Sequence, residues 1–265
     1  LKKPTDMRAI LLLFAGLLFF MGCKEEPKTT QEIIPAVSAE KTPLKAMETK
    51  ITPVEHASFI LEFEGKTIFV DPVGGAAQFP GEPDLILVTD IHPDHMDAET
   101  LAGTIAENTI FIAPKAVQNS LPDSLKTKIR TMNNGESLSL GNIKIEALPM
   151  YNLREEAKEF HTKGRGNGYL LESDDQRIYI AGDTEDIPEM RELKDIDIAF
   201  IPMNLPYTMP VESAADAVLE FSPKKVYPYH YRGQNGFSDI DKFKNLVETN
   251  SEDIQVIQLD WYPDN

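Results

Sequence analysis

Apolar residues from Ile51 onward fall into short runs that are separated by turn-forming residues. The first two runs, Phe59–Phe63 and Thr67–Val70, are joined across Glu64-Gly65-Lys66, which predicts a β-hairpin. Leu85–Val88 is short, apolar and β-branched, which predicts a buried strand. Further strands are predicted at Ile110–Ala113, Lys128–Met132, Ser137–Leu140, Ile143–Ala147, Tyr169–Glu172, Ile196–Ile201 and Ile254–Leu259, and others begin at Ile178 and Lys225.

Three segments have the spacing of helices. Asp97 is a suitable N-cap for a helix over roughly Ala98–Glu107. Val211–Phe221 places its apolar residues at helical intervals and ends before Pro223, and a third helix is predicted over roughly Asp239–Glu248. Strands and helices mixed in this way predict one α/β (α+β) domain over residues 51–265, and no internal repeat or second domain is evident.

The N-terminal segment has the features of an export signal. Basic residues precede an apolar run, Ala9–Gly22, which ends at Cys23, the only cysteine of the chain. The run is shorter than the ~20 residues that span a bilayer, so a signal peptide over residues 1–23 is favoured over a buried helix. Phe20-Met21-Gly22-Cys23 resembles a bacterial lipobox, which implies lipidation at Cys23. We therefore expect an exported lipoprotein, anchored in a membrane by lipid and facing the periplasm or the cell surface.

Residues 24–50 are polar, contain three prolines and show no clear period, which predicts a flexible tether. A single cysteine excludes a disulfide within the chain. With 26 basic and 43 acidic residues, the net charge is −17. Such a protein is a poor general binder of polyanions, because that binding depends on clustered Lys and Arg. Nucleic acid is therefore not an expected partner.

Candidate metal ligands cluster where the strand Leu85–Val88 ends. Asp90, His92, Asp94 and His95 follow it within six residues. Asp90 and His92 are expected to project to one side and Asp94 and His95 to the other, so that the segment serves two ions. The alternative is a polar turn with incidental histidines. Strand ends hold side chains precisely, as metal geometry requires.

Three later motifs support the metal hypothesis. His161 lies in a glycine-rich turn just before a predicted strand. Asp183 follows the run from Ile178 through a glycine turn, and His230 closes the strand that begins at Lys225. Each would be an ordinary turn residue in isolation. A resemblance to a known family, given next, implies that all three are metal ligands, which would place four of the five histidines of the chain at ligand positions.

The pattern D-x-H-x-D-H at Asp90–His95 resembles the H-x-H-x-D-H signature of the metallo-β-lactamase fold superfamily. The resemblance covers about Pro53 to Asp260. It implies a four-layer αββα sandwich with two zinc ions at one edge. It also implies the ligands: Asp90, His92 and His161 for the first ion, Asp94, His95 and His230 for the second, and Asp183 bridging them. A water between the ions would be the nucleophile, oriented by Asp94.

Asp90 departs from the superfamily pattern, which has histidine there. A carboxylate adds negative charge and is a harder donor, so manganese or iron could replace zinc. The opening of the domain, from His56 through the hairpin to Asp71, resembles the subgroup of ascorbate-6-phosphate lactonases and N-acyl-phosphatidylethanolamine phospholipase D. His56 is then either a substrate contact or a structural histidine, and Asp71 is expected to orient a neighbour or to cap the turn rather than to bind metal.

Other residues near the predicted ligands are candidate substrate contacts. Lys163, Arg165 and Arg232 follow ligand positions and could bind an anionic group on a small-molecule substrate, although ordinary surface charge also explains them. Asn204 and Tyr207 lie in a loop after a predicted strand and could stabilise an oxyanion. The sequence leaves the oligomeric state open.

These features predict a metal-dependent hydrolase that acts on a small ester, lactone or phosphodiester. Two alternatives stay open. One is a non-catalytic binding lipoprotein on the same scaffold, although all seven ligand positions hold competent residues. The other is a di-iron redox protein, which would need a flavin partner that this sequence does not contain.

Overall fold

The computed structural model describes residues 48–263. The predicted signal peptide, its Cys23 and nearly all of the predicted tether lie outside the described residues. The first strand, β1, begins at Lys50, next to Ile51, where the domain was expected to begin.

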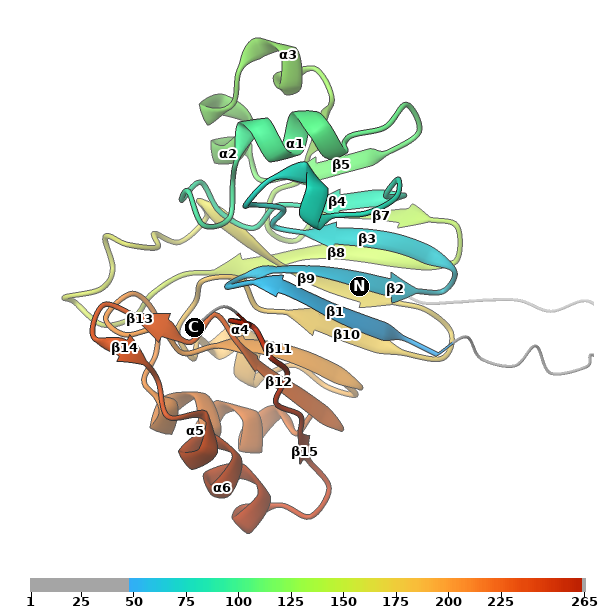
Figure 1. Ribbon diagram of the computed structural model, residues 1–265. Coiled ribbons are helices and arrows are strands. Elements are labelled where there is room, and N and C mark those ends of the chain that lie inside the picture. Colours follow the sequence, from blue (N-terminus) through green and yellow to red (C-terminus); the bar gives the residue numbers. More distant parts are fainter. Residues whose placement is uncertain (1–47, 264–265) are drawn as a thin grey trace, which may run out of the picture. The chain divides into compact units, whose positions relative to one another are not determined.

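Two large sheets form the centre of the domain (Figure 1). The first has six strands in sequential order: β1 (Lys50–Glu55), β2 (Ser58–Phe63), β3 (Lys66–Val70), β4 (Leu85–Leu87), β5 (Ile110–Ala113) and β6 (Ile129–Thr131). Strands β1 to β3 are antiparallel, and β3 to β6 are parallel. The hairpin predicted across Glu64-Gly65-Lys66 joins β2 to β3.

The second sheet has seven strands in the spatial order β15-β12-β11-β10-β9-β8-β7. Their bounds are β7 (Ser137–Leu140), β8 (Ile143–Met150), β9 (Gly166–Glu172), β10 (Arg177–Ile180), β11 (Ile198–Pro202), β12 (Lys225–Tyr229) and β15 (Gln255–Val256). Strands β10, β11, β12 and β15 are parallel, so their carboxyl ends share one edge. A small separate hairpin consists of β13 (Arg232–Gly233) and β14 (Gly236–Phe237).

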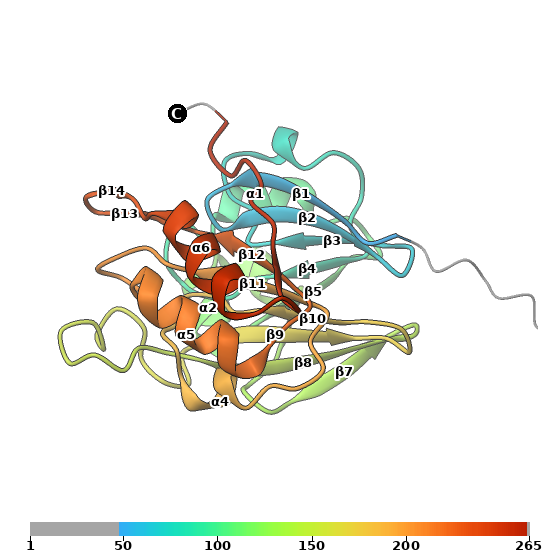
Figure 2. The same ribbon diagram turned by 90° about the horizontal axis from the view of Figure 1, so that it is seen from below.

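Helices cover the outer face of each sheet. The first sheet carries α1 (Ala98–Thr104), α2 (Lys115–Ser120) and α3 (Asp123–Lys126), with the 3₁₀ turn η1 (Ala76–Gln78), and the second carries α4 (Pro188–Arg191), α5 (Val211–Phe221) and α6 (Ile240–Asn250). Seen from below, α5 and α6 lie side by side near β11 and β12 (Figure 2). The four layers are therefore αββα, which confirms the predicted fold.

Successive apolar side chains along the strands of the first sheet alternate between two hydrophobic cores, one between the sheets and one under the outer helices. In β2, Phe59 and Leu61 point between the sheets, whereas Ile60 points outward. In β3, Phe69 likewise faces the outer helices, where it lies in one cluster with Leu101 of α1. Successive residues of a strand point to opposite faces, so strands that are apolar on both faces must be covered on both sides. This is why the first sheet lies between helices and the second sheet.

Several local predictions were adjusted by the structure. Asp97 does cap α1, accepting from the backbone N–H groups of Glu99 and Thr100, but the helix ends at Thr104 rather than Glu107. The last predicted strand, Ile254–Leu259, is reduced to Gln255–Val256. Helices α2 and α3 were not predicted, because each is too short to show a clear helical period.

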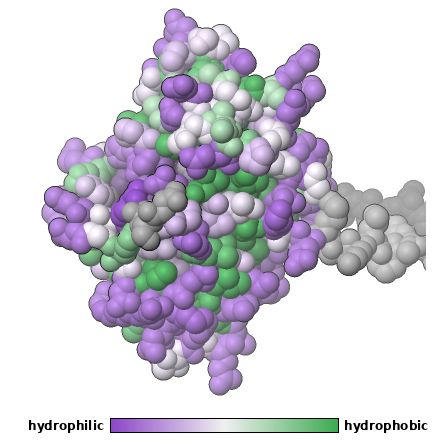
Figure 3. Space-filling model, viewed as in Figure 1, coloured by the Kyte–Doolittle hydropathy of each residue, from purple (hydrophilic) through white to green (hydrophobic). Residues whose placement is uncertain are grey.

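Hydrophilic residues cover most of the face shown in Figure 3, consistent with the high content of charged residues. Among the large apolar side chains of the described residues, only Leu153, Leu205 and Phe237 are classed as exposed. Within residues 48–263, no helix combines the length and apolar character that crossing a bilayer requires.

Replacing Phe200 with alanine should destabilise the domain by about 3–5 kcal/mol. Its ring is fully buried and stacks on Phe59 of the facing sheet at 4.5 Å between centroids, so its loss leaves a cavity between the sheets. Urea denaturation at constant metal content would measure the change. Phe237→Ala is the matched control, because that ring is 52% exposed, and it should change stability by about 0.5 kcal/mol or less. Equal effects of the two substitutions would contradict this placement of the core.

Candidate metal centre

The predicted ligands come together where strands of both sheets end. Asp90 to His95 follow β4, Asp183 follows β10 and His230 follows β12. Parallel strands present their carboxyl ends at one edge of a sheet, and the two sheets place these edges against each other. His161, from the loop before β9, completes the group.

One set of ligand atoms comes from Asp90, His92 and His161. Asp90 Oδ2 lies 2.9 Å from His92 Nδ1 and 3.8 Å from His161 Nε2. Ligand atoms held ~2.1 Å from a tetrahedral ion are separated by ~3.4 Å. We call this set the first metal position, since it contains the residues predicted for the first ion.

The residues predicted for the second ion, Asp94, His95 and His230, also lie close together, and His56 is near enough to Asp94 and His230 to form a ligand group with them. The Nε2 atoms of His95 and His230 are 3.1 Å apart. Asp94 Oδ2 lies 3.5 Å from His230 Nε2, and Asp94 Oδ1 lies 3.9 Å from His95 Nε2. We call the set of Asp94, His95 and His230 the second metal position. Asp90 and His92 thus lie near each other, while Asp94 and His95 lie near His230.

Asp183 lies between the two positions. Its Oδ2 is 3.1 Å from His161 Nε2 and 3.3 Å from His95 Nε2, while its Oδ1 is 3.2 Å from His230 Nε2. One carboxylate therefore touches histidines of both sets, as the prediction of a bridging ligand requires.

Unsatisfied polar atoms show that these residues fit metal ions. Among the described residues, His161 Nε2 and Asp183 Oδ1 are buried and have no hydrogen-bond partner. Buried polar groups are rarely left unpaired. The atoms face a common space instead of forming good hydrogen bonds with each other, which is the arrangement expected of a ligand set.

Further contacts orient the ligand rings. His95 Nδ1 lies 2.8 Å from Asp71 Oδ2, and His161 Nδ1 lies 3.1 Å from the carbonyl oxygen of Tyr207. Each contact leaves Nε2 directed at the site, as in many metal-binding histidines. Asp71 also accepts hydrogen bonds from the backbone N–H and hydroxyl of Thr89. It therefore orients a neighbour, as the sequence suggested, and lies outside the ligand sets.

The backbone at the site has strained or unusual conformations. Asp71, His230 and His56 all have positive φ angles, of 44°, 46° and 58°. Non-glycine residues seldom adopt this region, and such residues cluster at functional sites. Gly182, just before Asp183, has a φ of 66°, and a Cβ there would lie 2.7 Å from Met150 Sδ. Only glycine fits this turn without displacing its neighbours.

Charge interactions dominate the protonation of the metal-free site. Burial by itself would raise the pKa of Asp183, but the neighbouring His230, His95 and His161 hold it well below its usual value. Burial likewise opposes the charged forms of His95 and His230, yet Asp183 raises the pKa of both above 6.5. Without metal, Asp183 thus favours the charged forms of His95 and His230.

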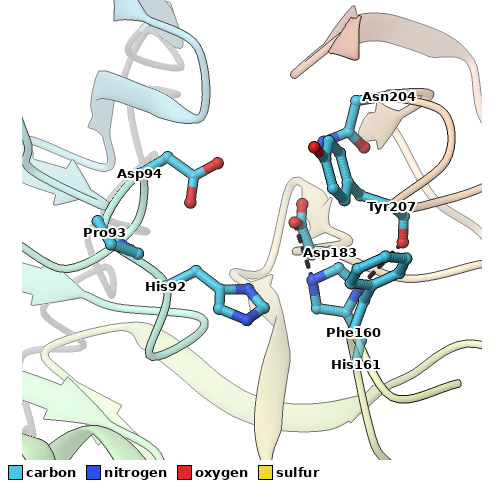
Figure 4. A pocket seen from close by; sticks show the side chains of 8 residues that line it. All are labelled: His92, Pro93, Asp94, Phe160, His161, Asp183, Asn204 and Tyr207. Atoms are coloured by element: carbon cyan, nitrogen blue, oxygen red, sulfur yellow. Dashed lines mark hydrogen bonds and ion pairs between the residues drawn. The ribbon is translucent and has the colours of Figure 1, made fainter. Parts of the chain in front are cut away.

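A pocket of about 290 Å³ opens over the two positions. His92 and Asp94 line it from one side, while Asp183 and His161 lie opposite (Figure 4). A second pocket of about 310 Å³ shares Pro93 and Asp94 with the first. Asp94, whose side chain is 40% exposed, therefore stands between the two pockets.

His56 lies at the second pocket and contacts the site directly. Its Nε2 is 3.3 Å from Asp94 Oδ2, and its ring lies 3.8 Å from that of His230. Its Nδ1 is 2.7 Å from the hydroxyl of Tyr262. Burial lowers the pKa of His56 to about 4, so the ring is neutral near pH 7. The sequence did not indicate Tyr262, which comes from the opposite end of the domain.

Each of the three basic side chains predicted as a candidate substrate contact has an acidic partner in the protein. Arg165 forms an ion pair with Asp90, at 2.7 Å between Nη2 and Oδ2. Lys163 Nζ lies 2.6 Å from Glu189 Oε1 and is largely exposed. Neither residue lines the two pockets. Arg232 does line the second pocket, although its guanidinium also lies 3.2 Å from Glu55.

The two polar residues of the loop after β11 line the first pocket, as expected. Asn204 is buried, and its Nδ2 lies 3.2 Å from His230 Nδ1. Tyr207 contributes its side chain to the pocket wall (Figure 4), while its carbonyl oxygen orients His161. Asn204 therefore supports a ligand as well as facing the pocket, a role that the sequence did not reveal.

Residues 50–230 match the family model of the beta-lactamase superfamily domain. The chain is 31% identical over 232 residues to a UPF0173 metal-dependent hydrolase of Methanopyrus kandleri, covering 80% of this chain and 96% of that protein. It is 32% identical over 218 residues to a UPF0173 metal-dependent hydrolase of Lysinibacillus sphaericus, covering 77% and 93%.

Solved structures show the same fold. A proposed metal-dependent hydrolase from Parabacteroides distasonis superposes with a TM-score of 0.73 at 40% identity, covering 81% of this chain and 94% of that chain. Igni18, a metallo hydrolase from Ignicoccus hospitalis, gives 0.66 at 24% identity over 80% and 94%. The diiron β-hydroxylase CmlA from Streptomyces venezuelae gives 0.62 at 21% identity over 80% and 53%. At these two lower identities the likeness shows the fold alone.

The metal-free protein should lose stability as the pH rises above 6.5 and passes through the raised pKa values of His95 and His230. The raised pKa values of His95 and His230 mean that their protonation stabilises the folded state. This contribution is complete below 6.5 and is lost as the pH passes through the raised values. Thermal unfolding of chelator-treated protein should show Tm decreasing over this interval.

Asp183→Asn is the control for this pH dependence, because it removes the charge that raises both histidine pKa values. Its Tm should vary much less over the same interval. A wild-type Tm that stays constant or increases with pH would contradict the charge network.

Proposed function

As this chain belongs to the metallo-β-lactamase superfamily and is a metal-dependent hydrolase, we propose that it holds two divalent ions, zinc in the first instance. We further propose that it hydrolyses a small ester, lactone or phosphodiester. The relatives named above are described as metal-dependent hydrolases without a substrate, so the substrate class rests on the site and on the resemblance of the His56–Asp71 segment to lactonases and phospholipase D.

One observation carries the proposal. Seven candidate ligand residues from four separate segments each lie within 3.5 Å of another member of the set, beside an open pocket. Two of their buried atoms, His161 Nε2 and Asp183 Oδ1, have no partner among the described residues. Ions bound there would supply Lewis-acid activation of water and of the scissile oxygen.

Residues that line the pocket are suited to orient an attacking water and to stabilise an oxygen that gains negative charge. Asp94 is the ligand carboxylate that is most exposed to the pockets, so its free oxygen is placed to orient an attacking water and to accept its proton. Asn204 and Tyr207 line the wall opposite Asp94 (Figure 4). They are suited to donate hydrogen bonds to an oxygen that gains negative charge.

The two adjoining pockets suggest how a substrate is accommodated. Because both include Pro93 and Asp94, a substrate with its reactive bond near Asp94 would extend into each. Arg232 lines the second pocket and could bind a carboxylate or phosphate group there. The net charge of −17 disfavours nucleic acid, because binding of nucleic acid depends on many clustered cations. A small anionic ligand could instead be bound by Arg232 alone.

An iron-dependent activity is the second candidate, because Asp90 contributes a harder oxygen donor than histidine. The fold is shared with the diiron β-hydroxylase CmlA, although such a likeness shows no activity. Metal analysis together with the hydrolysis assay distinguishes the candidates: hydrolysis with bound zinc, manganese or iron supports the hydrolase, while iron with a visible absorption band and no hydrolysis supports the redox protein.

We also propose that the chain is an exported lipoprotein. The basic and apolar segment before Cys23 and the polar residues 24–50 support it. The acyl chain would hold the catalytic domain at a membrane surface on the outer side of the cytoplasmic membrane, and the tether would let the pocket face solvent.

Protein purified without chelator should contain close to two metal ions per chain, and it should hydrolyse members of a panel of phosphodiesters, lactones and β-lactams. Chelation should abolish this activity and added zinc should restore it. Asp183→Ala should lower metal content and reduce kcat/KM by at least about 100-fold, because the bridging carboxylate is lost.

Asp123→Ala is the control, because that carboxylate is 98% exposed and remote from the site; it should keep full metal and activity. If Asp183→Ala retained full metal content and activity, the bridging role would be refuted. Binding of panel compounds without turnover would favour the non-catalytic alternative.

Expression of the full chain in a bacterium should place it in the membrane fraction, with incorporation of labelled fatty acid. Cys23→Ser should abolish labelling and release the protein, because no other thiol is present in the chain. Labelling that persists in Cys23→Ser, or a wild-type protein found unlabelled in the cytoplasm, would exclude the lipoprotein proposal.

A further inference from the structure

Arg165 occupies an unusual place for a cation, next to a metal ligand. Its Nε donates to Asp90 Oδ1 at 3.0 Å, and its Nη2 donates to Asp90 Oδ2 at 2.7 Å. Nη2 also donates to the carbonyl oxygen of Phe160. The Asp90 side chain is fully buried, and that of Arg165 is 17% exposed. This two-pronged geometry is the strongest form of the arginine–carboxylate pair.

The two metal positions differ in the residues that pair with their carboxylates. In the described part of the chain, the ion-pair partners of Asp94 are His56, His95 and His230, and those of Asp183 are also histidines. No lysine or arginine pairs with either carboxylate. A permanent cation therefore accompanies the first metal position and is missing from the second.

The difference has a direct electrostatic consequence. A buried carboxylate requires a neutralising partner. At the second position, a divalent ion can supply that charge itself once the histidines release their protons. At the first position, Arg165 has already neutralised Asp90, and an arriving ion would also be repelled by the guanidinium across a short, poorly solvated distance.

We propose that Arg165 weakens the first metal position, so that ions fill the Asp94–His95–His230 position first and the Asp90–His92–His161 position last. The proposal rests on the binding of two ions proposed above. Arg165 is a positioning and charge-setting residue: it contacts Asp90, and it contacts neither pocket. The enzyme would then exist with one or two ions, depending on the free metal concentration.

Removing the arginine of a purely structural ion pair should affect stability in a different way. Arg154 offers a comparison within the same chain, because its Nε lies 2.6 Å from Oε1 of Glu185, whose side chain is only 2% exposed. Glu185 accepts hydrogen bonds from backbone N–H groups and belongs to neither ligand set. Removing Arg154 should therefore destabilise the metal-free and metal-loaded proteins equally.

The order of filling can be measured without any substrate. Chelator-stripped full-length protein is titrated with zinc by calorimetry, and metal content is measured after gel filtration. Two binding steps are expected, with affinities that differ by at least tenfold. His161→Ala should remove the weaker step, and His230→Ala should remove the tighter one. The opposite assignment, or two equal steps, would overturn the proposal.

Arg165→Met provides the second test. It leaves Asp90 buried without a counter-charge, so the Tm of the metal-free protein should decrease. Saturating zinc should restore most of the loss, because the ion then neutralises Asp90. The weaker zinc step should tighten by at least tenfold, and the tighter step should change less than threefold. Arg154→Met is the matched control, with the same Tm loss in both metal states and unchanged zinc affinities.

If Arg165→Met does not fold, Arg165→Lys keeps the charge but loses the two-pronged contact, and its weaker step should tighten by a smaller factor. Asp90→Asn should weaken only the weaker step. Unchanged zinc affinities in all Arg165 variants that fold would overturn the inference while leaving metal binding intact. Failure of the wild-type protein to bind any ion would instead refute the function proposed above.

Discussion

The burial of carboxylates at the meeting edge of the two sheets is the constraint on which the site depends. Asp71, Asp90 and Asp183 are each at most 2% exposed. A charge removed from water to this extent is tolerated only with close, well-oriented partners. The protein supplies different partners to each: His95 to Asp71, Arg165 and His92 to Asp90, and three histidines to Asp183.

This constraint explains much of the surrounding structure. Because the partners come from separate strands and loops, the electrostatic network can form only when the two sheets are packed together. Conversely, the network fixes the loop ends whose backbone is otherwise unfavourable, such as the positive φ at Asp71 and His230. The packing of Phe59 against Phe200 in the apolar core thus maintains the alignment of the polar site.

The substitution of aspartate for histidine at position 90 has consequences beyond the choice of metal. The extra negative charge is matched by Arg165, 75 positions later in the chain, so that the pair is electrically equivalent to a neutral side chain. Asp94 has no such counter-cation and remains partly exposed between the two pockets. The two halves of the site are therefore similar in ligand type and different in charge.

The sequence by itself predicted most of the strands, most of their limits and the candidate ligand residues, because alternation and strand-ending motifs are local patterns. It also indicated that Asp71 orients a neighbour. It did not determine the partners of Arg165, Lys163 and His56, which were only candidates for contact with substrate. Those partners lie tens to hundreds of residues away, and a charged side chain pairs with whichever opposite charge the closed fold brings near. The packing of one sheet on the other brought Arg165 to Asp90, whereas the pairing of β9 with β10 within the second sheet brought Lys163 near Glu189.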